Sequence, residues 1–139
     1  MPLPTIEQIR PVDCLALRRD VLWPDLTAQQ CAVEGDEQAR HFGIHADGQL
    51  VSCLSLFEIA AASFQIRKFA TASGFQQQGL GTALLTHAIA QVRAQGGQRI
   101  VLNARTSACA FYARHGFSRF GEVSQRDGVS FVSMGLDLR

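Results

Sequence analysis

The sequence predicts an α/β fold in which a mixed β-sheet carries helices on both of its faces. Asp47-Gly48 and Asp127-Gly128 each lie between two apolar runs, which is typical of a β-hairpin with a tight turn. Residues 81–92 place apolar side chains at steps of three and one, which is one face of a helix. The apolar run 99–104 follows that helix and indicates a buried strand. These three observations together define the fold class.

The first part of the chain predicts a strand, a helix and a hairpin. Residues 5–10 are expected to form a short strand. Pro11 then begins a helix, because its missing N–H is not needed in the first turn. The acidic segment 27–38 is expected to form a short helix and a loop, and residues 41–60 form the first hairpin. The apolar residues expected on the buried side of the first helix are Val12, Leu15, Ala16 and Leu22.

The second part predicts a strand, a glycine loop, a helix and another strand. Residues 63–71 form the strand before the loop, and Gly96-Gly97 ends the helix that follows it. Such a strand–helix–strand unit is expected to be a right-handed crossover. Residues 107–115 fit a short helix, and residues 117–138 close the chain with the second hairpin.

Composition limits the class of protein. The 139 residues fit one domain, 1–139, with 47% hydrophobic and 18% charged residues, and the net charge of +1 gives no field for nucleic acid or an anionic membrane. No apolar run approaches the roughly 20 residues of a membrane span, and the amino end has no signal pattern, so a cytoplasmic protein is expected. The four cysteines are scattered, and no metal is expected.

The stretch Gln76 to Gly81, QQQGLG, can bind an anion through its backbone. A helix begins with N–H groups that have no internal partner, its dipole favours negative charge, and glycine lets a phosphate approach. The alternative is a tight strand-to-helix turn with no ligand. A Walker loop is excluded because no lysine follows Gly81, and the dinucleotide fingerprint fails because Leu84 stands where its third glycine is required.

Two blocks of sequence carry a family resemblance. QQQGLG resembles the [RQ]-x-x-G-x-[GA] signature of the GCN5-related N-acetyltransferases (GNAT), whose loop wraps the pyrophosphate of acetyl-CoA. ACAFYARHGF, residues 108–117, resembles the A-x-x-x-Y-x-x-x-G-F segment of the same family. The chain is most similar to small bacterial members of the ElaA group. The resemblance implies a mostly antiparallel sheet of about six or seven strands with a splayed central strand pair.

The resemblance also implies where acetyl-CoA binds. The pantetheine arm pairs with the backbone of the strand before the loop, the loop amides hold the pyrophosphate, and Gln76 shapes the turn. Asn103, at the end of a strand, is expected to hold the cofactor or the substrate. The cofactor-binding residues implied in this way are Phe69, Ala70, Thr71, Gln76, Gln77, Gln78, Gly79, Leu80, Gly81, Thr82 and Asn103.

Tyr112, the only tyrosine, matches the family position of a general acid that protonates the departing CoA thiolate. The alternative is a packing residue on an amphipathic helix.

The general base stays open, although Glu58, near the end of a strand beside the expected splay, is preferred. His41 and His45 are expected to share a strand face. The candidate bases are Glu34, Asp36, His41, His45, Glu58 and Glu122.

The sequence therefore predicts an enzyme that moves an acetyl group from acetyl-CoA to a primary amine by direct attack, without a metal. Arg105 replaces an asparagine that many family members carry, so it can meet a phosphate, a carboxylate or solvent. Cys109 as an acyl-carrying nucleophile is the minority alternative. A non-catalytic acyl-CoA-binding module is the alternative function. The expected partner is a small-molecule or peptide amine, and a homodimer is common in the family.

Overall fold

The computed structural model describes residues 4–138. They form seven strands, three α-helices and two 3₁₀ turns, at Gln29–Cys31 and Thr106–Ala108. The helices are α1 (Pro11–Val21), α2 (Leu80–Ala94) and α3 (Cys109–Ala113). The strands are β1 (Glu7–Ile9), β2 (Arg40–Ala46), β3 (Gln49–Ala60), β4 (Ser63–Thr71), β5 (Arg99–Arg105), β6 (Ser118–Arg126) and β7 (Val129–Asp137).

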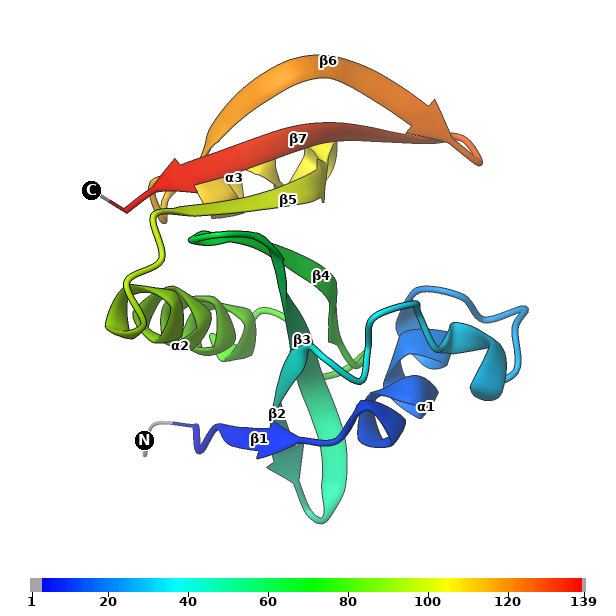
Figure 1. Ribbon diagram of the computed structural model, residues 1–139. Helices are drawn as coiled ribbons and strands as arrows, with labels where there is room; N and C mark the ends of the chain where they lie inside the picture. The colour runs from blue at the N-terminus through cyan, green and yellow to red at the C-terminus, as the bar shows by residue number, and fades with distance from the viewer. Residues whose placement is uncertain (1–3, 139) are drawn as a thin grey trace. The chain divides into compact units, whose positions relative to one another are not determined.

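The strands form one mixed sheet in the order β1-β2-β3-β4-β5-β7-β6 (Figure 1). The pairs β1–β2, β2–β3, β5–β7 and β6–β7 are antiparallel, whereas β4 and β5, joined through α2, are parallel. Parallel pairing is what the predicted crossover requires. The seven-stranded mixed sheet with its helices confirms the fold class predicted from the sequence.

The pairing of β4 with β5 is short. It joins Ser63 to Arg99, Phe64 to Ile100 and Gln65 to Val101, and no further. Yet β4 continues to Thr71 and β5 continues to Arg105. The register between β4 and β5 therefore covers only the first part of each strand.

The contacts divide the chain into two compact units. The first comprises residues 4–57 and 67–88, and the second comprises residues 58–66 and 89–138. The first unit holds β1, α1, β2, most of β3, the end of β4, the glycine loop and the start of α2. The second holds β5, α3, β6 and β7.

In the first unit, α1 and the start of α2 cover opposite faces of the sheet. Cys14 and Leu17 of α1 pack with Cys53 of β3 in a buried cluster. His87 of α2 contacts Phe42 of β2, with ring centroids 4.8 Å apart. Phe42 is adjacent in β2 to the partner of Cys53 and so points to the other face. Figure 1 shows the two helices on either side of β2 and β3.

The buried face of α1 differs from the prediction. Val12 is 60% exposed and Ala16 is also exposed, whereas Cys14, Leu17 and Arg18 are buried. The apolar pattern was misleading because one core position carries a charge. Arg18 is fully buried because Asp36 neutralises it, and no local pattern indicates such a distant partner.

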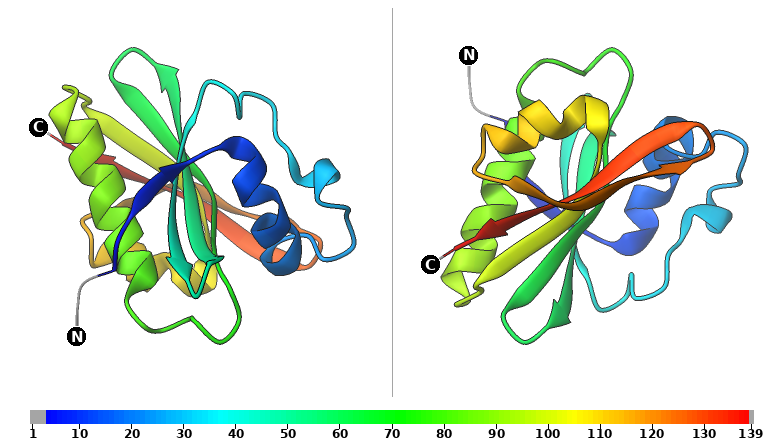
Figure 2. Two further views of the ribbon diagram at one scale, coloured as in Figure 1. Left: turned by 90° about the horizontal axis from the view of Figure 1, so that it is seen from below. Right: turned by 90° about the horizontal axis from the view of Figure 1, so that it is seen from above.

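In the second unit, β5 lies between β4 and β7, and β6 forms the outer edge beyond β7 (Figure 2). Ile100, Leu102 and Ala104 of β5 are buried, in the alternation of a half-buried strand. All nine residues of β6 are exposed, and its register with β7 shifts between Phe120 and Ser124.

Both Asp-Gly turns adopt the conformation that a two-residue hairpin favours. Asp47 and Gly48 have φ of 52° and 79°, and Asp127 and Gly128 have φ of 51° and 78°. Two consecutive positive φ angles match the right-handed twist of the flanking strands. Both predicted hairpins are confirmed, as is the end of α2, where Gly97 N–H donates to Val92 O at 2.8 Å.

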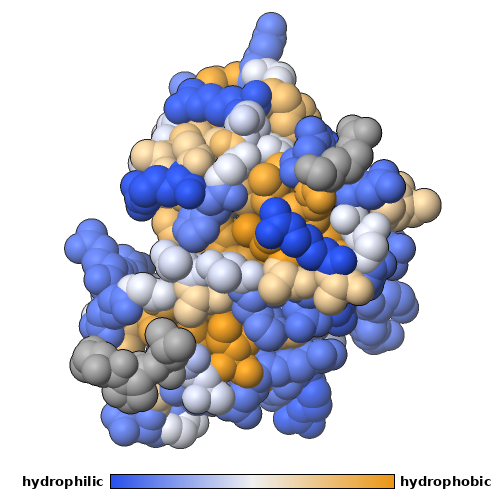
Figure 3. All heavy atoms as spheres, turned by 90° about the vertical axis from the view of Figure 1, so that its left-hand side faces the viewer, coloured by the Kyte–Doolittle hydropathy of each residue, from blue (hydrophilic) through white to orange (hydrophobic). Residues whose placement is uncertain are grey.

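The face drawn in Figure 3 is mostly hydrophilic, and its hydrophobic atoms lie in separate patches. Across residues 4–138, no helix combines the length and the apolar character needed to cross a bilayer.

Candidate functional site

The loop between β4 and α2 is held in place by its own glutamines. The side-chain amide of Gln76 donates to the carbonyl of Thr71 at 3.1 Å. The side-chain amide of Gln78 donates to the carbonyl of Gly74 at 3.1 Å. Each bond closes a short loop of four or five residues. The two glutamine side chains therefore fix the path of the loop backbone.

The backbone of this loop is left-handed at three places. Gly74, Gln77 and Gly79 have φ of 90°, 62° and 83°. A Cβ atom added to Gly79 would meet no atom within 4 Å. Glycine is needed there for its conformation, and the space above it is open. An approaching ligand would therefore meet the main chain of Gly79 directly.

The main-chain amides of residues 76–82 donate to no other main-chain group in the described part of the chain. Helical bonding begins with Ala83, whose N–H donates to Gly79 O at 3.0 Å. This run of free N–H groups lies at the positive end of the α2 dipole, and Gln76, Gln77, Gln78 and Gly79 are exposed. The donor set suits an anion with several oxygens, such as a diphosphate.

The strand end that leads into the loop is anchored to β3. Ser52 Oγ and Thr71 Oγ1 lie 2.8 Å apart, and Ser52 Oγ also donates to Ala70 O at 3.4 Å. The N–H of Ala72 donates to Val51 O at 2.7 Å. Ala70 is buried, whereas Phe69 and Thr71 are half-buried. The predicted residues from Phe69 to Thr82 are thus brought together in the first unit.

Asn103 and Tyr112 belong to the second unit. Asn103 is exposed on β5, and its side-chain oxygen accepts a hydrogen bond from Ser133 Oγ at 2.9 Å. Tyr112 lies on α3, where its ring makes edge contacts with Phe111 and Phe117 at 5.1 and 5.9 Å between centroids. Their assignment as cofactor-binding and acid residues stays a prediction.

Tyr112 lies in surroundings that disfavour its ionisation. Burial, with a smaller effect of Cys109, raises its pKa to about 12. The phenol is therefore protonated throughout the physiological range and can donate a hydrogen bond or a proton. Cys109 is buried and its thiol points to Arg105 O at 3.7 Å, whereas the Arg105 side chain is exposed.

The candidate bases separate into exposed and buried groups. Glu34, Glu58 and Glu122 are exposed. His45 is exposed as well, and its Nδ1 lies 3.3 Å from Glu7 Oε1. His41 is buried, so the two histidines have different surroundings. The register of β2 with β3 shifts between Ile44 and His45, and this irregularity interrupts the simple alternation used in the prediction.

A buried polar network connects α1, β2 and β3. Arg18 donates to both carboxylate oxygens of Asp36, at 2.7 and 2.9 Å, and to Ser55 Oγ at 3.1 Å. Nδ1 of His41 lies 2.7 Å from Ser55 Oγ, and its Nε2 lies 2.8 Å from Asp36 O. A carbonyl oxygen only accepts, so Nε2 carries the proton. Asp36 and His41 are structural members of this network rather than exposed bases.

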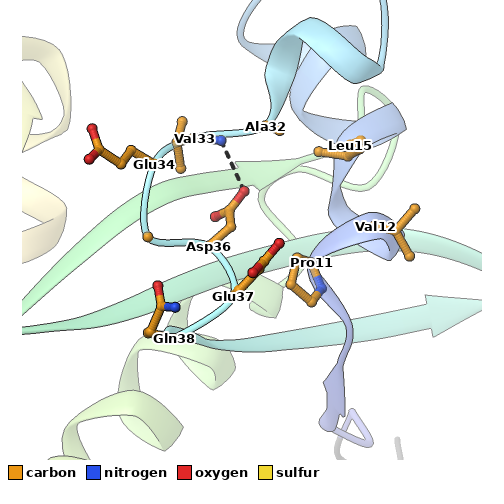
Figure 4. Close-up of a pocket in the computed structure, with 10 residues that line it drawn as sticks. Pro11, Val12, Leu15, Ala32, Val33, Glu34, Asp36, Glu37 and Gln38 are labelled. Atoms are coloured by element: carbon orange, nitrogen blue, oxygen red, sulfur yellow. Dashed lines mark hydrogen bonds between the residues drawn. The ribbon is translucent and has the colours of Figure 1, made fainter.

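Asp36 also shapes a nearby cavity. The cavity measures about 340 Å³ and lies between the first turns of α1 and the segment 32–38 (Figure 4). The Asp36 carboxylate accepts a hydrogen bond from Val33 N–H at 3.0 Å, which bends this segment into a turn. Glu37 lies beside Pro11, and Glu34 points away from α1. The predicted acidic loop is thus a cavity wall held by a buried ion pair.

Sequence reasoning did not identify the Arg18–Asp36 pair or the anchoring role of Gln78, whereas the resemblance already implied that Gln76 shapes the turn. The first joins residues far apart in the chain, and the local motif gives no sign of it. The second could have been anticipated, because glutamine side chains next to a turn can bond the backbone.

Comparisons with known proteins agree with this geometry. The family model described as an acetyltransferase (GNAT) domain matches residues 16–138. The chain is 28% identical over 132 residues to the uncharacterized N-acetyltransferase YitI of Bacillus subtilis, covering 89% of each chain.

Solved structures show the same fold at low sequence identity. Escherichia coli ElaA has a TM-score of 0.82 at 17% identity, covering 96% of this chain and 99% of its own. The ribosomal-protein-S18-alanine N-acetyltransferase of Escherichia coli has a TM-score of 0.81 at 20% identity, covering 98% and 94%.

Proposed function

Because the chain belongs to the GNAT acetyltransferase family, we propose that it moves an acetyl group from acetyl-CoA to a primary amine. The observation that carries this proposal is the run of unbonded amides at residues 76–82, with open space above Gly79. The amides would hold the diphosphate of the cofactor without a basic side chain. The end of β4, from Phe69 to Thr71, would pair with its pantetheine arm.

The proposed reaction is direct attack on the thioester. The neutral amine forms a bond to the carbonyl carbon, the carbon–sulfur bond breaks, and the sulfur leaves as a thiolate. A main-chain N–H from residues 69–71 polarises the carbonyl. Tyr112 donates its phenolic proton to the thiolate, and the proton lost from the amine passes to a base or to water. No covalent enzyme intermediate forms.

The cofactor site has a direct test with a matched control. Gly79→Val places a side chain in the open space above the loop, so acetyl-CoA affinity measured by calorimetry should fall at least tenfold, about 1.4 kcal/mol. Gly74→Val is the control, because Gly74 has φ of 90°, and a Cβ there also meets no atom within 4 Å. Its strain is comparable, but it precedes the amide run. Unchanged affinity in a folded Gly79→Val protein would contradict the cofactor site.

Turnover requires a second measurement. Thiol release from acetyl-CoA is followed with an alkylamine, a polyamine, an amino-acid amide and short peptides. Release that depends on one of these amines supports the enzyme and identifies the acceptor class. Binding of acetyl-CoA without release for any amine would favour the alternative, a non-catalytic acyl-CoA-binding module. A ligand at 100 times its Kd should stabilise either protein by about 2.7 kcal/mol.

A further inference from the structure

We propose that Trp23 is a positioning residue for acyl transfer, because its indole ring holds Lys68 and thereby fixes a left-handed residue in β4. The Nζ atom of Lys68 lies 3.9 Å from the centroid of the Trp23 ring. Lys68 directly precedes Phe69, the first residue of the proposed cofactor-pairing segment. The catalytic part of this inference rests on the proposed function. The contact between Lys68 and the Trp23 ring, or clamp, can be measured without it.

Trp23 is fixed by the end of α1. Its N–H donates to the carbonyls of Arg18 and Arg19, at 3.1 and 3.2 Å, which continues the hydrogen bonding of the helix past Val21. Its own carbonyl accepts a hydrogen bond from Leu26 N–H at 3.0 Å. The side chain is half-buried. The main chain at Trp23 is therefore held by hydrogen bonds on both sides, and the half-buried indole extends from this fixed backbone.

Lys68 has a conformation that strands rarely contain. Its φ is 54°, in the left-handed region, although it lies inside β4. A side chain with a Cβ is disfavoured there, so surrounding contacts must hold the residue in place. Its carbonyl has a weak contact with Cys53 Sγ, at 4.0 Å. Its ammonium lies over the Trp23 ring, and a cation over an indole face is attracted by the ring quadrupole.

The left-handed residue determines how the next residues present their backbone. When one residue of a strand has a left-handed rather than an extended φ, the N–H and C=O groups that follow it point in a different direction. The affected groups are those of Phe69, Ala70 and Thr71, which the proposed reaction uses. Without the clamp, Lys68 can relax towards extended φ, and the thioester carbonyl loses its aligned N–H donor. The loop amides at residues 76–82 do not depend on Lys68, so the proposed diphosphate contacts are kept and cofactor affinity should fall only slightly.

The neighbouring residue supplies a matched control. Arg67 lies over the Phe57 ring, with its guanidinium carbon 5.2 Å from the centroid, and is also a cation beside an aromatic ring in β4. Unlike Lys68, Arg67 does not have a positive φ. Removing its charge therefore breaks a similar contact without releasing a strained residue.

The experiment compares Trp23→Leu, Lys68→Met, Lys68→Arg and Arg67→Met with the wild type. The expected result for Trp23→Leu and Lys68→Met is a fall in kcat of about tenfold, with the KM for acetyl-CoA changed less than about threefold. The acceptor is the amine that gives the fastest thiol release in the wild type. Lys68→Arg keeps a cation over the indole and should restore most of kcat. Arg67→Met should retain wild-type kcat.

A second readout does not depend on turnover. The exchange of the Phe69 amide hydrogen with solvent, followed by NMR, should be faster in Trp23→Leu and Lys68→Met and unchanged in Arg67→Met. Unchanged exchange and kcat in folded Trp23→Leu would overturn the clamp, as would equal losses in Arg67→Met. Failure of the proposed function looks different, because the wild type would then release no thiol from acetyl-CoA with any of the amines. Exchange would still report whether Trp23 holds β4.

Discussion

Arg18 and Asp36, 18 residues apart in the chain, form a two-bond ion pair inside the first unit, at 2.7 and 2.9 Å. The Arg18 side chain is completely buried and that of Asp36 is 7% exposed. The pair joins α1 to the segment that forms one wall of the cavity next to it. It therefore links the first helix to the loop before β2, as does the bond from Arg18 to Cys31 O at 3.0 Å.

Asp36→Asn should destabilise the protein strongly. The substitution removes the negative charge but leaves the Arg18 guanidinium buried, and breaking a buried pair in this way costs about 3–5 kcal/mol. Urea unfolding followed by circular dichroism measures the loss. The double variant Arg18→Met, Asp36→Leu removes both charges and should recover most of the stability. A free energy of unfolding for Asp36→Asn within about 0.5 kcal/mol of the wild type would contradict this account.

Low pH should lower the free energy of unfolding, because it protonates the Asp36 carboxylate. Burial alone would raise the pKa of Asp36, but hydrogen bonds from Arg18 and from Val33 N–H, together with the nearby positive charge, outweigh it and lower the pKa. A lowered pKa in the folded state means that the stabilisation is complete above the unfolded value of about 3.9 and is lost as the pH falls below it.

The free energy of unfolding should therefore fall as the pH drops from about 4 towards the lower, folded pKa of Asp36. In the Arg18→Met, Asp36→Leu protein this part of the pH dependence should be absent. If both proteins lose stability equally over this range, other carboxylates are responsible for the acid sensitivity.

Tyr112→Phe should lower kcat and leave acetyl-CoA affinity unchanged. Loss of a general acid costs about 10²–10⁴ in rate, and the remaining ring keeps the packing against Phe111 and Phe117. Because the pKa of Tyr112 is raised to about 12, its ionisation should produce no alkaline loss of kcat below about pH 10 in the wild type. Full activity of Tyr112→Phe across the pH range would remove the tyrosine from the mechanism.

Gln76→Leu should weaken acetyl-CoA binding without unfolding the protein. The variant loses the exposed bond to Thr71 O, and such a bond contributes about 1 kcal/mol, equivalent to roughly a fivefold change in Kd. Calorimetry gives the affinity, and the thermal midpoint checks the fold. An unchanged Kd would mean that the loop keeps its path without this glutamine.

Local chemistry explains which parts of the fold could be predicted. The Asp-Gly pairs carry their turn geometry within two residues, so both hairpins followed directly from the sequence. The face of α2 also followed, because Leu84, Leu85 and Ala88 lie on one side and are all fully buried. The glycine loop before α2 was predicted for the same reason, whereas its role as a cofactor site stays a prediction.

Distant partners explain what could not be predicted. The buried side of α1 depends on Asp36, which reaches Arg18 only after the chain has folded. The positions of His41 and His45 depend on a register shift in β2 that single-residue alternation does not anticipate. The contact between Trp23 and Lys68 joins two elements that are far apart in the sequence. In each case the decisive interaction is tertiary rather than local.

The outer edge strand has a consequence for the behaviour of the protein at high concentration. The unpaired side of β6 could accept a strand from another molecule, yet its register breaks after Phe120, and Gly121 has φ of 78°. Arg119, Glu122 and Arg126 also place charges along this edge. An edge strand with a register break and several charges disfavours intermolecular strand addition. The sheet is therefore protected against edge-to-edge aggregation along β6.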